Sequence, residues 1–206
     1  MIDNFEQIGK LLSFTSDDEF YFCQVLKRKK ENPELGSNSR VVKTYFIKSV
    51  EELEEDKGEM IMLANYHNAR VYINLNKRSF ERTCYHTLKK ITDQIMNRDF
   101  KQAREAYASV CGMYAAETDK TWVVDVDEPE IFSLMIAHIE CECEPLHPIK
   151  YGETGMVIAF KSKIIDKIRT KNGWHLITRP FDLKKFSDKY PDIDVHKNNP
   201  TILYIP

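Results

Sequence analysis

Hydrophobic residues in the first 115 positions recur with two periods, which predict a mixture of helices and strands. A spacing of three to four residues is typical of a helix with one apolar face, whereas runs of aromatic and β-branched residues favour strands. We expect helices over residues 4–13, 49–58, 80–95 and 100–114, and strands over residues 19–30 and 40–47. The segment "MIMLANYHNARVYINLN" is interpreted as a β-hairpin that turns at His67 and Asn68.

The second half of the chain alternates between strand and helix patterns. The expected strands are residues 121–127, 153–162, 173–179 and 201–206, and the expected helices begin at Pro129 and Asp182. This β-α-β-β-α-β order is that of a split βαβ sheet, also called ferredoxin-like or RRM-like. The segment "KIIDKIRT" either extends the second strand or forms a linking turn.

The pattern predicts an α+β fold with two lobes. We expect an N-terminal α/β lobe over residues 1–118, packed against a C-terminal RRM-like lobe over residues 119–206. The N-terminal half has no obvious closing strand of its own. The two lobes are therefore expected to behave as parts of one unit, which could be a single compact domain.

Composition narrows the class of protein without identifying a partner. The 206 residues are 42% hydrophobic and carry a net charge of −2, so overall charge does not indicate a nucleic-acid binder, although a local basic groove is compatible with it. Five scattered cysteines favour a reduced, cytoplasmic protein over a disulfide scaffold. No apolar run approaches the roughly 20 residues of a membrane-spanning helix, so no membrane association is expected.

Two carboxylates at the end of a hydrophobic strand are the first candidate site. In "TWVVDVD", Asp125 and Asp127 are two positions apart and would share one face of a strand. Two unpaired anions cannot both face the core, because desolvating them costs several kcal/mol each. They could cap the following helix, pair with nearby Lys or Arg, or share a divalent metal, since Mg²⁺ and Mn²⁺ prefer oxygen ligands.

The second candidate is the strand "GWHLITR" and the turn before it. Asn172 and Gly173 could take positive φ and form an anion cradle, with Lys171 and Arg179 flanking the strand. The first and third strands of a split βαβ sheet are neighbours. We therefore expect His175 to lie beside the strand of the two aspartates, on the same face, although for the residue taken alone a half-buried structural histidine is the better explanation.

The order of these motifs resembles that of the archaeo-eukaryotic primase and primase-polymerase superfamily. The resemblance lies in the Asp-hydrophobic-Asp strand and in "TKNGWH", a Thr-x-x-Gly-x-His motif on a later strand. It implies an RRM-like fold, in which Asp125 and Asp127 bind Mg²⁺ or Mn²⁺ and His175 contacts the triphosphate of a nucleotide. Lys171 and Arg179 would offset the phosphate charge.

The resemblance also implies a third carboxylate and contacts from the N-terminal lobe. The family carries that acid on a strand after the histidine, but "TILYIP" has none, so Asp194 in "DIDVH" is the first choice, because an alternating strand could direct it inward. The strand from Arg70 to Arg78 would contact the nucleotide. The expected partners are a nucleoside triphosphate and nucleic acid.

The function expected from these residues is metal-dependent nucleotidyl transfer of the primase-polymerase type, and two other classes stay open. One is a non-catalytic module that binds nucleic acid or protein on the same sheet. The other is a small phosphoesterase that uses His175 and His86 as acid and base. Cys141, Cys143 and His147 are close enough in sequence to suggest zinc, but their spacing favours a helix end followed by a turn.

Overall fold

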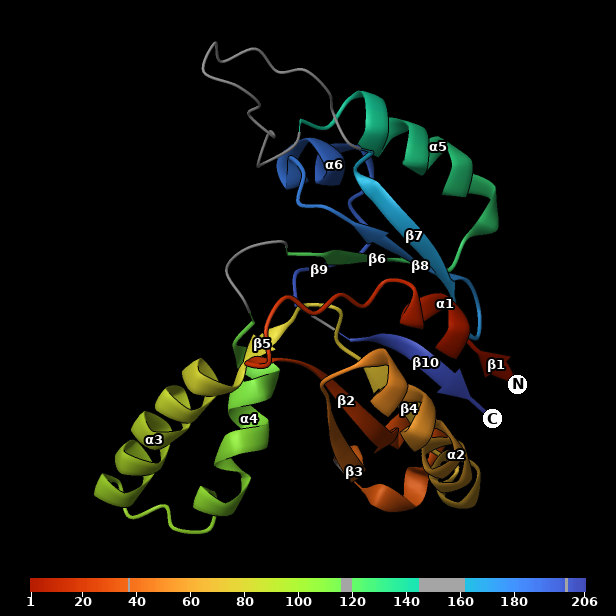
Figure 1. The fold of residues 1–206 in the computed structure, drawn as a ribbon. Coiled ribbons are helices and arrows are strands. Elements are labelled where there is room, and N and C mark those ends of the chain that lie inside the picture. The colour runs from red at the N-terminus through yellow and green to blue at the C-terminus, as the bar shows by residue number, and fades with distance from the viewer. Residues whose placement is uncertain (37, 116–119, 145–161, 199) are drawn as a thin grey trace. The chain divides into compact units, whose positions relative to one another are not determined.

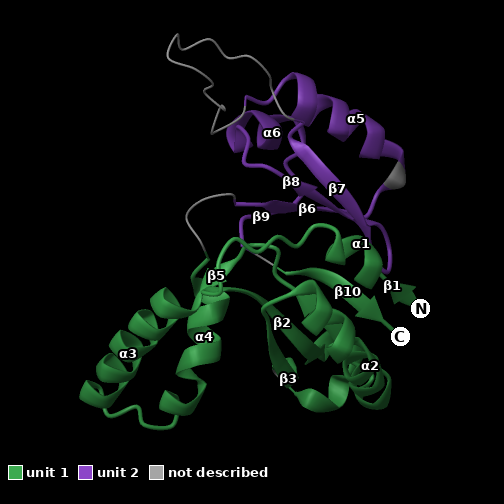
Figure 2. Cartoon of the chain, viewed as in Figure 1, with its two compact units in different colours: residues 1–118, 200–206 green, residues 119–199 purple. Residues whose placement is uncertain are grey.

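The chain forms two compact units, which are described separately. The computed structural model describes residues 1–36, 38–115, 120–144, 162–198 and 200–206 (Figure 1). Unit 1 consists of Met1–Thr118 together with Pro200–Pro206, and unit 2 consists of Asp119–Asn199 (Figure 2). The described residues form an α+β fold with two antiparallel sheets and six α-helices. None of the helices in these residues is long and apolar enough to cross a membrane.

Unit 1 is built on a six-stranded antiparallel sheet in which the C-terminal strand lies between two N-terminal ones. The strand order is β1-β10-β4-β2-β3, and β5 pairs with the start of β2. The strands are β1 (Ile2–Asp3), β2 (Glu19–Lys27), β3 (Arg40–Ile47), β4 (Arg70–Ile73), β5 (Arg78–Ser79) and β10 (Thr201–Ile205).

Helices pack on both faces of this sheet, which explains why β2 is apolar in consecutive positions. On one face, Cys23 of β2 contacts Met60 of α2 (Val50–His67). On the other, Phe20 and Phe22 form a cluster with Cys111 of α4 (Ala106–Met113). Unit 1 also contains α1 (Phe5–Gly9), α3 (Phe80–Met96) and the 3₁₀ turns η1 (Lys29–Glu31), η2 (Pro33–Leu35) and η3 (Ala103–Glu105).

The β-hairpin expected at residues 60–76 is wrong, because its first half is the second half of α2. The helix begins as expected, with the Ser49 hydroxyl accepting a hydrogen bond from the Glu52 N–H, but it continues through Gly58. Leu53, Met60 and Ala64 are all buried, and their spacing of seven and four residues belongs to one helix face. A short apolar run such as "MIMLAN" does not by itself distinguish a strand from a buried helix segment.

Unit 2 is a four-stranded antiparallel sheet whose order is β7-β8-β6-β9. The strands are β6 (Trp122–Val126), β7 (Ile164–Arg169), β8 (Trp174–Thr178) and β9 (Val195–His196), and the helices are α5 (Pro129–Cys141) and α6 (Leu183–Lys189). Both helices cover the same face (Figure 1), because Val124 and Leu176 share one hydrophobic core with Met135 of α5 and Phe186 of α6.

Two of the four strands expected in this sheet are placed differently. The segment 153–162 lies almost entirely outside the described residues, and "KIIDKIRT" forms β7 in its own right. The expected last strand, "TILYIP", is β10 of unit 1, and the shorter β9 pairs with β6 instead. Every residue of β10 is buried, which suits a strand in the interior of a sheet covered on both faces better than an edge strand.

Candidate functional site

His175 and Asp125 lie directly opposite each other on the two central strands of unit 2. They are register partners in the β6–β8 pair, and His175 Nε2 is 3.6 Å from Asp125 Oδ1. Their neighbours Val124 and Leu176 point into the helix-covered core, so alternation places both polar residues on the other face. The Asp125 side chain is 41% exposed and that of His175 is 13% exposed, so the pair is open to solvent mainly on the carboxylate side.

Asp194, the residue before β9, lies next to Asp125. The Asp125 N–H donates to the Asp194 carbonyl oxygen over 3.1 Å, one position beyond the register pair of Val124 with Val195. Val195 packs against the helix-covered core, so alternation places the Asp194 side chain on the same face as Asp125. The sheet therefore carries His175, Asp125 and Asp194 side by side, and we call these three residues the polar row.

Asp127 lies just past the end of β6, where Gly173 approaches the backbone. A Cβ atom on Gly173 would be 2.0 Å from the Val126 carbonyl oxygen and 2.8 Å from Asp127 Cα. The Thr170 hydroxyl accepts from the Gly173 N–H, and the Thr170 N–H donates to the Gly173 carbonyl. The expected positive φ is wrong, since neither Asn172 nor Gly173 has one, and the glycine is required for close packing instead.

Of the two basic residues expected around this strand, one lies at the same end as the polar row. Lys171 is exposed in the turn before Gly173. Arg179 follows the far end of β8, about 13 Å from His175 at the usual strand rise, and its N–H donates to the Lys163 carbonyl. Arg179 is therefore not grouped with the polar row, whereas Lys171 lies at the same end of β8 as His175.

Arg70 and Arg78 belong to unit 1, where both guanidinium groups are held by nearby oxygens. The Arg70 Nε donates to Glu31 over 2.9 Å and forms an ion pair with it. The Arg78 side chain is almost fully buried, donates to the carbonyl oxygens of Cys111 and Asn76, and has its pKa lowered to about 10 by burial. These contacts stabilise unit 1, and nothing in them indicates a nucleotide-binding role.

The polar row has residue types that suit a hard divalent cation, but its side chains do not converge on one point. Among the residues that the structure describes, no three His, Cys, Asp or Glu side chains are arranged to hold a metal ion. Mg²⁺ is commonly held by one or two carboxylates, with water and substrate phosphate completing its shell. Asp125 and Asp194, with Asp127 at the strand end, meet that requirement in number and chemistry.

Helix capping does not explain the acids of this segment. The N-cap of α5 is Glu128, and its side chain forms no capping hydrogen bond. Asp125 instead pairs with His175, and its N–H donates to the carbonyl oxygen of a second acid, Asp194, just before β9. Asp125 is partly exposed and Asp194 is exposed, so a cation in solution can reach both acids.

The residues of the other two candidate sites belong to different units, have other contacts or lie outside the described residues. His86 lies on α3 of unit 1, where its ring stacks on Tyr114 with centroids 4.1 Å apart. Cys141 is exposed and Cys143 is buried, which raises the pKa of the Cys143 thiol. His147 lies outside the described residues.

Comparison with known proteins returns no match: no family model matches this chain, and neither a curated protein nor a solved structure does. The polar row is thus the observation from which a function has to be inferred.

Proposed function

We propose that unit 2 binds a nucleoside triphosphate together with Mg²⁺ or Mn²⁺, and that the protein is a nucleotidyltransferase of the primase-polymerase type. The observation that carries this proposal is the polar row, in which His175 and Asp194 flank Asp125. Supporting it, β6 lies between the third and fourth strands of its unit, and all neighbours are antiparallel. A split βαβ, RRM-like sheet would have the same strand order, and this agreement supports the proposal.

In this proposal Asp125 and Asp194 hold the cation, and water and substrate phosphate would complete its shell. Asp127, at the end of β6, would add negative charge nearby. A divalent ion would neutralise the charge of these carboxylates. When bound, such an ion supplies stabilisation of the negative charge that develops on phosphate oxygens.

The remaining residues of the site would bind and orient the polyphosphate. His175 is held beside Asp125, so its ring has a fixed position on the sheet and can donate to a phosphate oxygen when protonated. Lys171 would add a second positive charge at the same end. Gly173 keeps the turn that carries Lys171 close to Asp127, which brings the cationic and anionic parts of the site together.

Calorimetric titration of the full chain with a nucleoside triphosphate, with and without MnCl₂, tests the proposal. We expect binding that depends on Mn²⁺ and that falls at least tenfold in Asp125→Asn and in Asp194→Asn. The matched control is Asp188→Asn, which removes an exposed carboxylate from α6, on the helix-covered side of the sheet. Absence of binding by the wild type, or equal binding by the two row variants and the control, would refute the proposal.

A non-catalytic binding module is the second candidate, because the described side chains form no cluster that could hold a metal. In that case single-stranded nucleic acid would bind in the presence of a chelator, and its affinity would fall as salt concentration rises. Primer extension separates the two functions. Incorporation of nucleotides that stops on addition of chelator supports the transferase, whereas chelator-resistant binding without incorporation supports the module.

A further inference from the structure

Much of the apolar surface of helix α3 is exposed. The helix lies beside α4 (Figure 1), where Lys90 donates to Ser109 and the His86 ring stacks on Tyr114, and at its start Phe80 packs on Phe20. Thr83 is its one fully buried side chain. In contrast, four large apolar residues of α3 are more than half exposed: Tyr85, Leu88, Ile95 and Met96. An amphipathic helix normally buries its apolar side, so α3 lacks a partner for that side among the described residues.

Four residues of α3 are spaced as in a helix that pairs with another helix. Cys84, Leu88, Ile91 and Ile95 follow one another at intervals of four, three and four residues. This is the a/d spacing of a heptad pattern, which keeps one narrow seam facing a partner helix over two heptads. We call these four residues the α3 seam.

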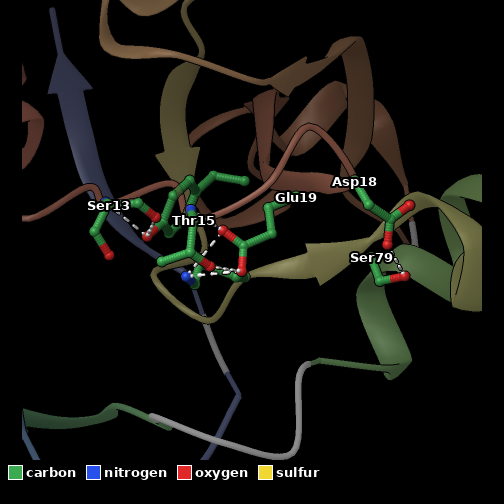
Figure 3. A network of polar contacts seen from close by, with 7 residues as sticks. Ser13, Thr15, Asp18, Glu19 and Ser79 are labelled. Atoms are coloured by element: carbon green, nitrogen blue, oxygen red, sulfur yellow. Dashed lines mark hydrogen bonds and ion pairs between the residues drawn. The ribbon is translucent and has the colours of Figure 1, made fainter.

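The start of α3 is held firmly, so the α3 seam is presented in a fixed direction. The Ser79 hydroxyl donates to Asp18 (Figure 3). It also accepts from the Arg82 N–H, and the Asp18 carboxylate accepts from the Glu81 N–H. The hydrogen bond from Ser79 is the main reason that the pKa of Asp18 is lowered. These bonds cap the helix and connect it to the loop that precedes β2.

We propose that the α3 seam is covered by the α3 seam of a second copy of this chain, with the two helices antiparallel. In that register Cys84 lies opposite Ile95 and Leu88 lies opposite Ile91 of the other copy. The same register brings Glu81, at the start of one helix, against Arg98, just past the end of the other; both are exposed. A parallel pair would instead bring Glu81 against Glu81. Antiparallel pairing also aligns the helix dipoles favourably.

The exposed area is sufficient for the centre of such an interface. Together, Leu88 and Ile95 of the α3 seam and Tyr85 and Met96 beside it, each more than half exposed, offer on the order of 500 Å² per copy. An interface of standard size buries about 800 Å² per partner. Further residues beside the α3 seam would supply the rim. The interface is self-complementary, as a two-fold dimer requires.

Sedimentation velocity of the full chain tests the dimer. We expect the wild type to sediment as a dimer of the 24.2 kDa chain, with a dissociation constant in the micromolar range or tighter, and Leu88→Glu to sediment as a monomer. The control is Leu134→Glu on α5, which adds the same charge at a leucine that is 67% exposed, compared with 65% for Leu88. A monomeric wild type, or equal behaviour of the two variants, would overturn the proposal.

Disulfide trapping tests the register independently. In Ile95→Cys, the introduced thiol should lie opposite the native Cys84 of the other copy, so mild oxidation with copper phenanthroline should give a covalent dimer on non-reducing gels. Adding Cys84→Ser should abolish the cross-link. Cys141, which is also exposed, is replaced by serine in all of these variants, so that a cross-link persisting without Cys84 would indicate a parallel pair and would contradict the antiparallel register. Absence of any cross-link would contradict it equally.

Discussion

The two units place charged groups in different surroundings. In unit 1, Arg70 is paired with Glu31, and the buried Arg78 donates to two backbone carbonyls. In unit 2, Asp125 pairs with His175 at a partly exposed position, and Asp194 beside it is exposed. The first arrangement satisfies buried cations within the fold, whereas the second leaves carboxylates where a cation in solution can reach them. Substitutions should therefore destabilise the protein in unit 1 and alter ligand binding in the polar row of unit 2.

The largest loss of stability is expected from Arg78→Met. This change retains much of the apolar stem of Arg78, but the carbonyls of Cys111 and Asn76 lose charged hydrogen bonds in a buried site. Leaving such groups unsatisfied should lower the free energy of unfolding by about 3 kcal/mol. Urea unfolding followed by far-ultraviolet circular dichroism measures the loss. The control is Arg104→Met, at an 87% exposed side chain, which should change stability little; equal losses would contradict a structural role for Arg78.

A smaller loss is expected from Gly173→Ala, in unit 2. The added methyl group would overlap the backbone at Val126 and Asp127, so β6 and the turn must separate. Overpacking of this kind costs about 2 kcal/mol. Both tryptophans of the chain, Trp122 and Trp174, lie in unit 2, so tryptophan fluorescence during urea unfolding reports this change selectively. Gly112→Ala, where an added Cβ meets no atom within 4 Å, is the control and should be tolerated.

The third prediction concerns Glu140, whose carboxylate fixes the start of β7. Burial acts to raise its pKa, but hydrogen bonds from Ser162 and from the N–H groups of Ile164 and Lys163 outweigh burial and hold the pKa below its ordinary value. Glu140→Gln should therefore lower the free energy of unfolding by about 1 kcal/mol near neutral pH.

The pH dependence of this effect has a definite sign. Because the folded chain holds the Glu140 proton more weakly than the unfolded chain does, its contribution is complete above the ordinary glutamate pKa and is lost as pH falls through the folded value. The difference between wild type and Glu140→Gln, measured by urea unfolding at a series of pH values, should shrink in acid. A difference that grows in acid would contradict this assignment.

Local sequence patterns predicted the individual strands and helices of unit 2 better than they predicted which strands pair. The strand of Asp125, the strand of His175 and their adjacency follow from alternation and from the β-α-β-β-α-β order. The assignment of "TILYIP" to this sheet was wrong, because strand pairing depends on which apolar surfaces remain uncovered after folding, and local sequence does not encode that choice. The run of apolar residues in α2 was misassigned for the related reason that burial, rather than local preference, selected the helix.

For the candidate site, too, sequence patterns predicted some features and missed others. Alternation alone suggested that Asp194 would be directed inward, and its backbone lies beside Asp125; its role stays a prediction. Gly173 was selected for a positive φ that it does not have, because sequence shows that a glycine is present but does not show which neighbour approaches it. Arg179 was grouped with His175 because the two are close in sequence, yet four residues of extended strand separate them widely.

The smallest effect on stability is expected in the polar row itself. This prediction also best separates a role in ligand binding from a role in the fold. Asp194→Asn removes an exposed charge and Asp125→Asn removes the partly exposed partner of His175, so each should change the free energy of unfolding by about 0.5 kcal/mol or less. In MnCl₂ with a nucleoside triphosphate, the wild type should gain thermal stability through ligand binding, and both variants should lose that gain. Thermal unfolding of the three proteins, with and without the ligands, separates the two contributions. If Asp125→Asn were as destabilising without ligand as Arg78→Met, the carboxylate would have to serve the fold, and the contrast between the units would disappear.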